Sequence, residues 1–264
     1  INIVQVQRVT AMHTMLSQNL LVRTGNILNL NEAKTKASQN PTDELIETLK
    51  IVLRDNEGIG ENPIIVCEGI EDNALKDINR EDVKITVKVF ISSPDVNLLK
   101  EAIDQVCNSL NINAIESLVI AYSGKENSED ILSSLKHLWT GVEEYVKIGK
   151  LSSVGLSDVN TNEFIDLFQW ANVVKPNIVQ ISLATCCIVP PALQTFTKEN
   201  DVQLLTHNDP GRNQEDLNGI FNANTNVHWV TRYQIHLKCR GILSSKGYLI
   251  YVNKQTTIIE LTIT

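Results

Sequence analysis

The stretch IGKLSSVGLSD, residues 148–158, contains the unit from which we predict the fold. A helix is expected to end at Gly149-Lys150, and a short apolar strand to run from Leu151 to Val154. The chain then reaches Gly155-Leu156-Ser157-Asp158, where polar side chains follow the strand. In barrel enzymes the functional side chains collect at strand ends of this kind. The stretch therefore predicts an alternation of helix and strand, and it directs attention to the strand ends.

The same alternation continues along the chain on both sides of this stretch. Ser93-Pro94 supplies a helix start after one apolar run, Asn160 and Glu163 resemble a capping box, and Pro190-Pro191 opens another helix. A further helix is predicted over residues 229–239, before the last strand. The predicted strands cover residues 64–67, 83–91, 118–122, 151–154, 178–183, 202–205 and 242–243.

Alternating strands and helices predict an α/β fold with a parallel sheet and right-handed crossovers. The chain has 264 residues, and a closed (β/α)8 TIM-type barrel takes about 250. We therefore predict a single barrel domain over residues 1–264, with an open doubly wound sheet as the alternative. The first 18 residues or so and the polar stretches 31–44 and 208–228 are expected to be peripheral, the two stretches as surface loops.

Composition excludes several classes of protein. The net charge is −8, and no cluster of Lys and Arg with interleaved aromatic residues occurs, which argues against nucleic-acid binding. No apolar run has the length that a membrane span needs, and the first residues lack the layout of a signal peptide. The chain begins at Ile1 rather than Met, so we expect the true N-terminus upstream and some loops omitted. Five cysteines without a CxxC motif argue against a disulfide scaffold or zinc site and favour the cytoplasm.

Most motifs that carry chemistry are absent. We find no dinucleotide-binding glycine motif, no phosphate-binding loop and no HExxH, and the five histidines lack metal-ligand spacing, so no metal is expected. His207-Asn208-Asp209 lies at a strand end, where it suits either acid–base chemistry or a turn before Pro210. Cys186-Cys187 is either a reactive pair or an ordinary buried and surface pair.

On a barrel, several strand ends resemble those of aldo-keto reductases. GKLSSVGLSD (149–158) is similar to the fifth strand of that superfamily, with Ser157 and Asp158 in the places of a Ser and an Asn that hold the nicotinamide. Gln180 matches the amide-binding Gln of the sixth strand. The resemblance implies an NADP(H) site, although helix caps and strand polar residues explain these three equally well. For the phosphate end of NADP(H) we consider the predicted loop after the last strand, with Ser244, Ser245 and Lys246.

The catalytic groups that the same resemblance implies are mostly missing. The superfamily reduces carbonyls with a Tyr as proton donor, supported by a Lys, an Asp and a His. Lys88 matches the Lys, Ala121 stands in the place of the His, no tyrosine precedes Tyr122, and the Asp has no convincing match. Because such groups act as a unit, reductase activity is expected to be lost. An interior Lys88 needs a carboxylate, a phosphate or water nearby, which favours a retained nucleotide or anion, or a structural ion pair.

Four runs resemble a more specific family, the regulatory (modifier) subunits of glutamate–cysteine ligase. They are RTGNILN (23–29), VQISLATCCIVPP (179–191), QLLTHNDP (203–210) and RGILSSKGYLI (240–250). The resemblance extends over residues 20–251 and implies a cytoplasmic protein without chemistry or a required cofactor of its own. Such a protein binds the catalytic subunit in a heterodimer, eases glutamate use and weakens feedback inhibition by glutathione.

Two alternatives and one interface hypothesis remain from the sequence. The chain is alternatively a divergent NADPH-dependent reductase, or a module that senses NADP(H) without turnover. The strand-end face is a candidate surface for the catalytic subunit. Cys186 and Cys187 are expected near that face and Cys239 towards the opposite end, and an intersubunit disulfide through one of them is a hypothesis motivated by the odd number of cysteines.

Overall fold

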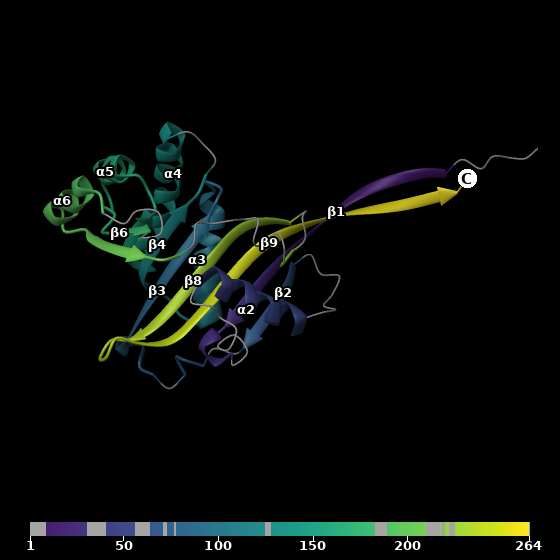
Figure 1. Ribbon diagram of the computed structural model, residues 1–264, viewed down its shortest axis with the longest axis horizontal. Coiled ribbons are helices and arrows are strands. Elements are labelled where there is room, and N and C mark those ends of the chain that lie inside the picture. The colour runs from purple at the N-terminus through teal and green to yellow at the C-terminus, as the bar shows by residue number, and fades with distance from the viewer. Residues whose placement is uncertain are drawn as a thin grey trace, which may run out of the picture.

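The structure is a computed structural model in which one nine-stranded sheet carries helices on its faces (Figure 1). It describes residues 9–30, 41–55, 64–70, 73–76, 78–124, 128–182, 189–209, 217, 220–221 and 225–263. The strands are β1 (Val9–Gly25), β2 (Ile64–Ile70), β3 (Val83–Ile91), β4 (Ile115–Tyr122), β5 (Leu151–Ser157), β6 (Ile178–Ser182), β7 (Gln203–His207), β8 (Thr225–Leu237) and β9 (Ile242–Ile263). The helices are α2 (Pro41–Asp55), α3 (Val96–Leu110), α4 (Ser128–Lys147), α5 (Thr161–Trp170) and α6 (Pro191–Glu199), with short 3-10 turns η1 (Ile27–Asn29) and η2 (Arg80–Asp82).

The predicted α/β alternation is confirmed in the middle of the chain. Strands β3 to β7 are parallel and lie side by side in sequence order, each joined to the next by one of the helices α3 to α6. Buried residues of all four helices belong to one apolar cluster with β3, so the helices cover the same face. In a barrel wall the strands follow one another in sequence order and the helices cover one face. A doubly wound sheet instead reverses its strand order and carries helices on both faces.

The remainder of the sheet differs from the prediction because it is largely antiparallel. The sheet order is β2-β1-β9-β8-β3-β4-β5-β6-β7, and β9 pairs antiparallel with both β1 and β8. Within the described residues, the order begins at β2 and ends at β7, and no ladder joins these two strands. The barrel-like wall is therefore not seen closed by backbone pairing. Figure 1 shows β1 and β9 continuing together beyond the rest of the sheet.

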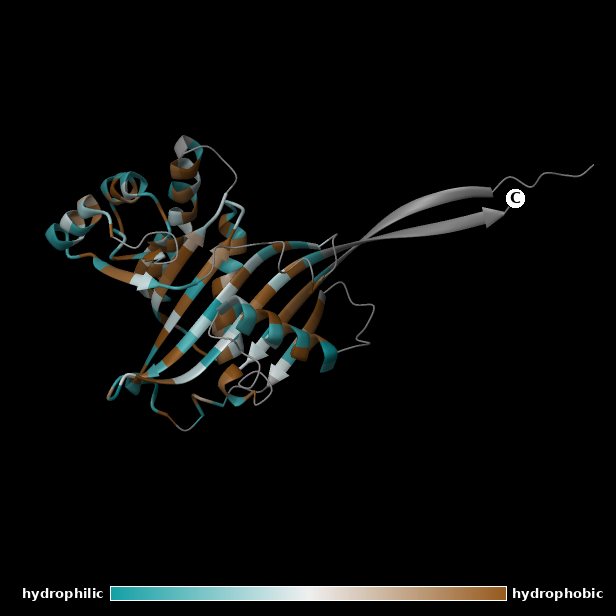
Figure 2. Ribbon diagram, in the orientation of Figure 1, coloured by the Kyte–Doolittle hydropathy of each residue, from teal (hydrophilic) through white to brown (hydrophobic). Residues whose placement is uncertain are grey.

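The helix predicted over residues 229–239 is wrong, because residues 229–237 belong to strand β8 and residues 238–239 to the turn that follows it. Trp229, Tyr233 and Ile235 are buried on the face that α3 covers, while Val230 belongs to a second apolar cluster. This alternation has the period of two that a strand requires, and the segment is rich in β-branched and aromatic residues. Figure 2 shows hydrophobic and hydrophilic residues alternating along β8 and β9.

Several predicted boundaries also change. Helix α3 is capped by Asp95, whose carboxylate accepts from the backbone N–H of Asn97 at 2.7 Å, rather than by Ser93. The capping box of Asn160 and Glu163 is confirmed at α5. Residues 41–44 of the predicted loop 31–44 form the first turn of α2, and residues 225–228 of the predicted loop 208–228 begin β8. Residues 31–40 lie outside the described part, as do 210–216, 218–219 and 222–224.

The two faces of the sheet carry separate apolar clusters. Odd-numbered residues of β3, from Val83 to Ile91, pack with α3 to α6. The other face is covered by α2 and Phe221 over strands β1, β2, β8 and β9. Even-numbered residues of β3 point towards this second face, where Phe90 contacts the second cluster. Lys88, two residues earlier on the same strand, therefore lies on the second face as well.

The burial pattern of β8 predicts the effect of truncating its side chains. Ile235 is fully buried, whereas Ile148 at the end of α4 is 65% exposed. We expect Ile235→Ala to lower the free energy of unfolding by about 2–5 kcal/mol, since it removes packed methyl groups and leaves a cavity. The matched substitution Ile148→Ala is expected to change it by less than about 0.5 kcal/mol. Urea denaturation measures both, and equal losses would contradict the strand assignment of β8.

Candidate functional site

The candidate site is a group of charged side chains on the second face of the sheet, around Lys88. The Lys88 side chain is 4% exposed, and its Nζ lies 2.8 Å from Oδ2 of Asp209, which is 7% exposed. The Lys88 ammonium also lies 5.2 Å from the centre of the Phe90 ring. Of the partners that the sequence allowed for an interior lysine, the structure shows a carboxylate. The structure thus shows the ion pair that was one of the two alternatives for Lys88.

Arg232 is a second cation on the same carboxylate. It lies opposite Lys88 in the antiparallel register of β3 and β8. Its Nη1 contacts Oδ1 of Asp209, and its Nη2 lies 3.2 Å from Oδ2. A guanidinium that binds both oxygens of a carboxylate is among the stronger pairings available in proteins. The three residues Lys88, Asp209 and Arg232 are called the carboxylate bridge below.

The carboxylate bridge is strongly coupled electrostatically. Burial alone would raise the pKa of Asp209, but the Arg232 guanidinium and the Lys88 ammonium outweigh burial and lower this pKa to about 2. Burial lowers the pKa of Lys88, and the Asp209 carboxylate opposes this effect. Asp209 is therefore ionised at neutral pH, and its charge compensates cations that would otherwise be buried without a partner.

The bridge joins strands that are far apart in the sheet order. Asp209 follows the end of β7, and strands β4, β5 and β6 lie between β7 and β3. Neighbouring strands are about 4.8 Å apart, so in a flat sheet β7 and β3 would be separated by about 19 Å. An ion pair of 2.8 Å between Lys88 and Asp209 therefore requires the parallel wall to curve strongly towards the second face.

A second group of side chains joins the ends of β5 and β7. Nε2 of His207 lies 2.9 Å from Oδ1 of Asp158 and 3.1 Å from Oγ of Ser157. The backbone N–H of Asp209 donates to Nδ1 of His207 at 3.1 Å. Because a backbone N–H can only donate, Nδ1 is the acceptor and the neutral ring carries its proton on Nε2. His207 therefore donates to Asp158 and stays in contact with the bridge through Asp209.

Asp158 is held in place by several donors. Its backbone has φ 58°, in the left-handed region that Asp adopts more readily than most residues. Its Oδ1 accepts the backbone N–H of Ser182 at 3.0 Å, and its Oδ2 accepts from Ser157 at 2.9 Å. Burial raises the pKa of Asp158, but the hydrogen bonds from His207 and Ser157 outweigh it and lower the pKa. The group is thus a fixed carboxylate with little hydrogen-bonding capacity left.

Two further predicted residues lie in the wall next to these groups. Gln180 is opposite Ser157 in the register of β5 and β6, and its buried Oε1 has no hydrogen-bond partner among the described residues. Ala121 is buried in β4, opposite Phe90 in the register with β3. The positions of Lys88, Ala121, Ser157, Asp158 and Gln180 on neighbouring strands agree with the predicted grouping at the strand ends.

Sequence reasoning missed Arg232 and left the role of Asp209 open. Arg232 falls in the segment 229–239 that was incorrectly predicted as a helix, and a helix there gave no reason to place residue 232 opposite Lys88. Asp209 belonged to a run that suited either acid–base chemistry or a turn, and neither alternative connected it with Lys88. A period-two pattern through residues 227–237 was the signal that pointed to Arg232.

A tyrosine, Tyr248, lies in the same cross-strand row. It is opposite Arg232 in the register of β8 and β9, and it is 3% exposed. Its hydroxyl donates to Oε1 of Glu44 in α2 at 2.7 Å. Burial and the Glu44 carboxylate raise the pKa of Tyr248 well above its usual value. This hydroxyl is directed to Glu44 rather than to Lys88, and its raised pKa makes it a weaker proton donor.

The predicted phosphate-binding loop is wrong, because Ser244, Ser245 and Lys246 lie within strand β9. Ser245 is fully buried, and the backbone carbonyl of Ser244 accepts from Asn26 at 3.3 Å. Nζ of Lys246 lies 2.6 Å from Oε1 of Glu44, so its charge is already compensated. These residues belong to the half of the sheet that α2 covers, whereas Ser157 and Gln180 lie on β5 and β6.

Of the three cysteines in the interface hypothesis, the structure describes only Cys239. Cys186 and Cys187 fall outside the described residues. Cys239 is exposed in the turn between β8 and β9. Because Leu237 pairs with Val83, that turn lies at the start of β3, opposite the strand ends that carry Ser157 and Asp158. The predicted position of Cys239 towards the opposite end is confirmed.

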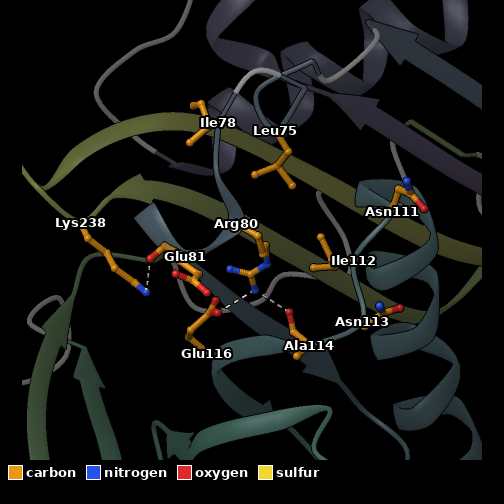
Figure 3. Close-up of a pocket in the computed structure, with 10 residues that line it drawn as sticks. All are labelled: Leu75, Ile78, Arg80, Glu81, Asn111, Ile112, Asn113, Ala114, Glu116 and Lys238. Carbon is orange, nitrogen blue, oxygen red and sulfur yellow. Dashed lines mark hydrogen bonds and ion pairs between the residues drawn. The ribbon is translucent and has the colours of Figure 1, made fainter.

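A polar groove of about 500 Å³ opens near the same end (Figure 3). Arg80 donates to the carbonyl of Ala114 at 2.8 Å and pairs with Glu116 at 2.7 Å, and Lys238 donates to the carbonyl of Glu81 at 2.7 Å. Its cations are thus bound to the protein itself, and it contains no residue predicted for function.

Across the described residues, no cluster of metal ligands is found and no helix is long and apolar enough to span a membrane.

Removing the negative charge of the carboxylate bridge should destabilise the protein strongly. We expect Asp209→Asn to lower the free energy of unfolding at pH 7 by about 3–5 kcal/mol, because two buried cations lose their counter-charge. Asp104→Asn, which affects a pair of half-exposed groups with Lys150, is expected to cost about 1 kcal/mol or less. Thermal or urea denaturation at pH 7 measures both, and a similar small loss at the two positions would contradict the role of the bridge.

The loss of stability caused by Asp209→Asn should also depend on pH. The pKa of Asp209 falls from 3.8 to about 2 on folding, so its contribution is complete above pH 4 and is lost as the pH falls towards 2. The stability difference between wild type and Asp209→Asn should therefore narrow by about 2 kcal/mol over this range. Urea titrations from pH 5 to 2 measure the difference, and a constant value would show that Asp209 is not the titrating group.

Sequence similarity, rather than similarity of shape, shows which proteins this chain is related to. No family model matches this chain. Among solved structures, the chain is similar to the aldose reductase of Giardia lamblia, at 14% identity and a TM-score of 0.38 over 70% of this chain and 64% of that chain. The human glutamate–cysteine ligase regulatory subunit is 33% identical over 90% of this chain and 94% of its own length. The bovine one is 32% identical over the same shares. The chain therefore belongs to the family of glutamate–cysteine ligase regulatory subunits.

Proposed function

We propose that this chain is a non-catalytic regulatory subunit that binds the catalytic subunit of glutamate–cysteine ligase in a cytoplasmic heterodimer. The observation that carries the proposal is the 33% identity to the human regulatory subunit, which extends over 94% of that protein. In the proposed complex the catalytic subunit joins the γ-carboxyl of glutamate to cysteine at the expense of ATP. The present chain eases the use of glutamate and weakens inhibition by glutathione.

The chemistry of the site supports a protein without reductase activity of its own. Carbonyl reduction needs a proton donor beside the carbonyl oxygen. Lys88 is bound to Asp209, the Tyr248 hydroxyl is bound to Glu44, and Ala121 has no titratable group. A Lys held by an Asp is itself part of the reductase mechanism, so the proposal rests on the other two groups: the Tyr248 hydroxyl donates to Glu44, and Ala121 stands in the place of the His.

Regulation of this kind has a thermodynamic consequence. A regulatory subunit changes the behaviour of a catalytic subunit only if it binds one of its conformations more tightly than another. Linkage then requires glutamate to tighten the contact between the subunits and glutathione to loosen it. Each ligand changes the affinity between the subunits by the same factor by which the regulatory subunit changes the affinity for that ligand. Such couplings are typically about 5- to 150-fold.

Co-purification and ligase assays test this proposal. We expect the chain to co-purify with a glutamate–cysteine ligase catalytic subunit, to lower its KM for glutamate and to raise the glutathione concentration that gives half inhibition, each by at least about 5-fold. The matched control is the catalytic subunit with an unrelated acidic protein of similar size. A chain that folds but neither co-purifies nor changes the two constants would contradict the proposal.

The same complex tests the proposed intersubunit disulfide. Complexes carrying Cys186→Ser, Cys187→Ser or Cys239→Ser are compared on non-reducing gels. A covalent heterodimer that disappears with one replacement identifies the bridging residue, and Cys239 is the exposed one of the described cysteines. A covalent dimer that survives all three single replacements would show that none of these cysteines is essential for it.

A module that senses NADP(H) is the second candidate, and one observation favours it. The buried Oε1 of Gln180 has no partner among the described residues and lies opposite Ser157, where the carboxamide N–H groups of a nicotinamide would find an acceptor. The phosphate end lacks matching support, since Lys246 is paired with Glu44. We therefore propose that the chain works without a required cofactor.

Calorimetry and a reductase assay separate these candidates. We expect no saturable heat with NADPH and no NADPH oxidation with a panel of aldehydes. Saturable heat that is lost in Gln180→Ala but kept in Gln194→Ala, a change of the same kind in α6, would establish the sensing module instead. Turnover of aldehydes that disappears in Lys88→Met would establish a divergent reductase.

A further inference from the structure

Two buried cations of the carboxylate bridge are placed by the sheet itself. Lys88 and Arg232 are directly opposite each other on the paired strands β3 and β8, and their side chains are 4% and 15% exposed. Their position therefore follows from the register of these strands. Asp209 comes from a separate part of the chain, two residues after the end of β7.

The two cations present the donors that oxyanions require. Arg232 contacts both oxygens of the Asp209 carboxylate, and Lys88 adds a further donor to Oδ2. A planar guanidinium that engages two oxygens, together with a nearby ammonium, suits a carboxylate or a phosphate equally. Asp158 contributes to the field at Lys88 and opposes an additional anion. The donor set therefore has room for one oxyanion, and Asp209 fills that place.

We propose that Lys88 and Arg232 form an oxyanion-binding site in which the Asp209 carboxylate is the resident occupant and a free carboxylate or phosphate is its competitor. This inference goes beyond the proposed regulatory function and does not depend on it. A tethered carboxylate competes at an effective concentration on the order of millimolar or more, so free anions bind weakly to the wild-type chain. An anion that replaces Asp209 also separates the end of β7 from β3 and β8, which couples anion binding to the curvature of the wall.

Removing the resident carboxylate tests the site in the full chain. The melting temperatures of wild type, Asp209→Ala and Asp209→Asn are measured with increasing acetate or phosphate, against chloride at equal ionic strength. We expect both variants to gain stability in a saturable manner, by roughly 5–10 °C at about one hundred times the dissociation constant. Wild type is expected to respond no more to these anions than to chloride. The acetate and phosphate arms distinguish a carboxylate ligand from a phosphate ligand.

Two matched variants control for general effects of anions. Adding Arg232→Met to Asp209→Ala removes one cation, so the response to acetate and phosphate should disappear. Asp104→Ala, which leaves the half-exposed Lys150 without its partner, should respond as wild type does.

Three outcomes would overturn the proposal. They are an equal response of wild type and Asp209→Ala, a response that survives Arg232→Met, and failure of both Asp209 variants to fold even in acetate or phosphate. Folding of either variant only in the presence of one of these anions would support it.

Discussion

The ion pair between Lys88 and Asp209 is the interaction on which the shape of the parallel wall depends. It connects the edge strand β7 with β3 across three intervening strands, and it adds β8 through Arg232. Backbone hydrogen bonds hold each strand to its neighbour but leave the curvature of the wall free to vary. A buried carboxylate between two buried cations fixes that curvature, because separating the charges would leave each of them without compensation in a medium of low dielectric constant.

The same interaction suits the binding role that we propose for this chain. His207, Ser157 and Asp158 complete one another's hydrogen bonds, and His207 contacts the bridge through the backbone of Asp209. A connected polar network stiffens its surroundings, since any rearrangement leaves donors or acceptors unpaired. Catalysis of carbonyl reduction needs the opposite property, a proton donor that is free to transfer. The side chains at the strand ends are engaged with one another, so they stabilise the wall.

The helix-covered half of the fold follows closely from sequence, and the antiparallel half does not. Strand β3 has the predicted bounds, and the capping box at α5 is present, because periodicity and capping act over a few neighbouring residues. Strand β8 was predicted as a helix, since its apolar residues also suit helical spacing over a short window. The pairing of β8 with β3 and β9 decided the outcome, and pairing depends on segments that are distant in the chain.

By itself, the sequence determined the α/β alternation, the family, and the need of an interior Lys88 for an anionic partner. These conclusions rest on local patterns, on four distinctive runs of residues and on the cost of burying an isolated charge. Only the tertiary structure decided that the partner is Asp209, that Arg232 shares it, and that Ser244 to Lys246 lie in a strand. The reason is physical: Asp209 is 121 positions from Lys88 in the chain, and such contacts are set by strand register and sheet curvature, which no local pattern encodes.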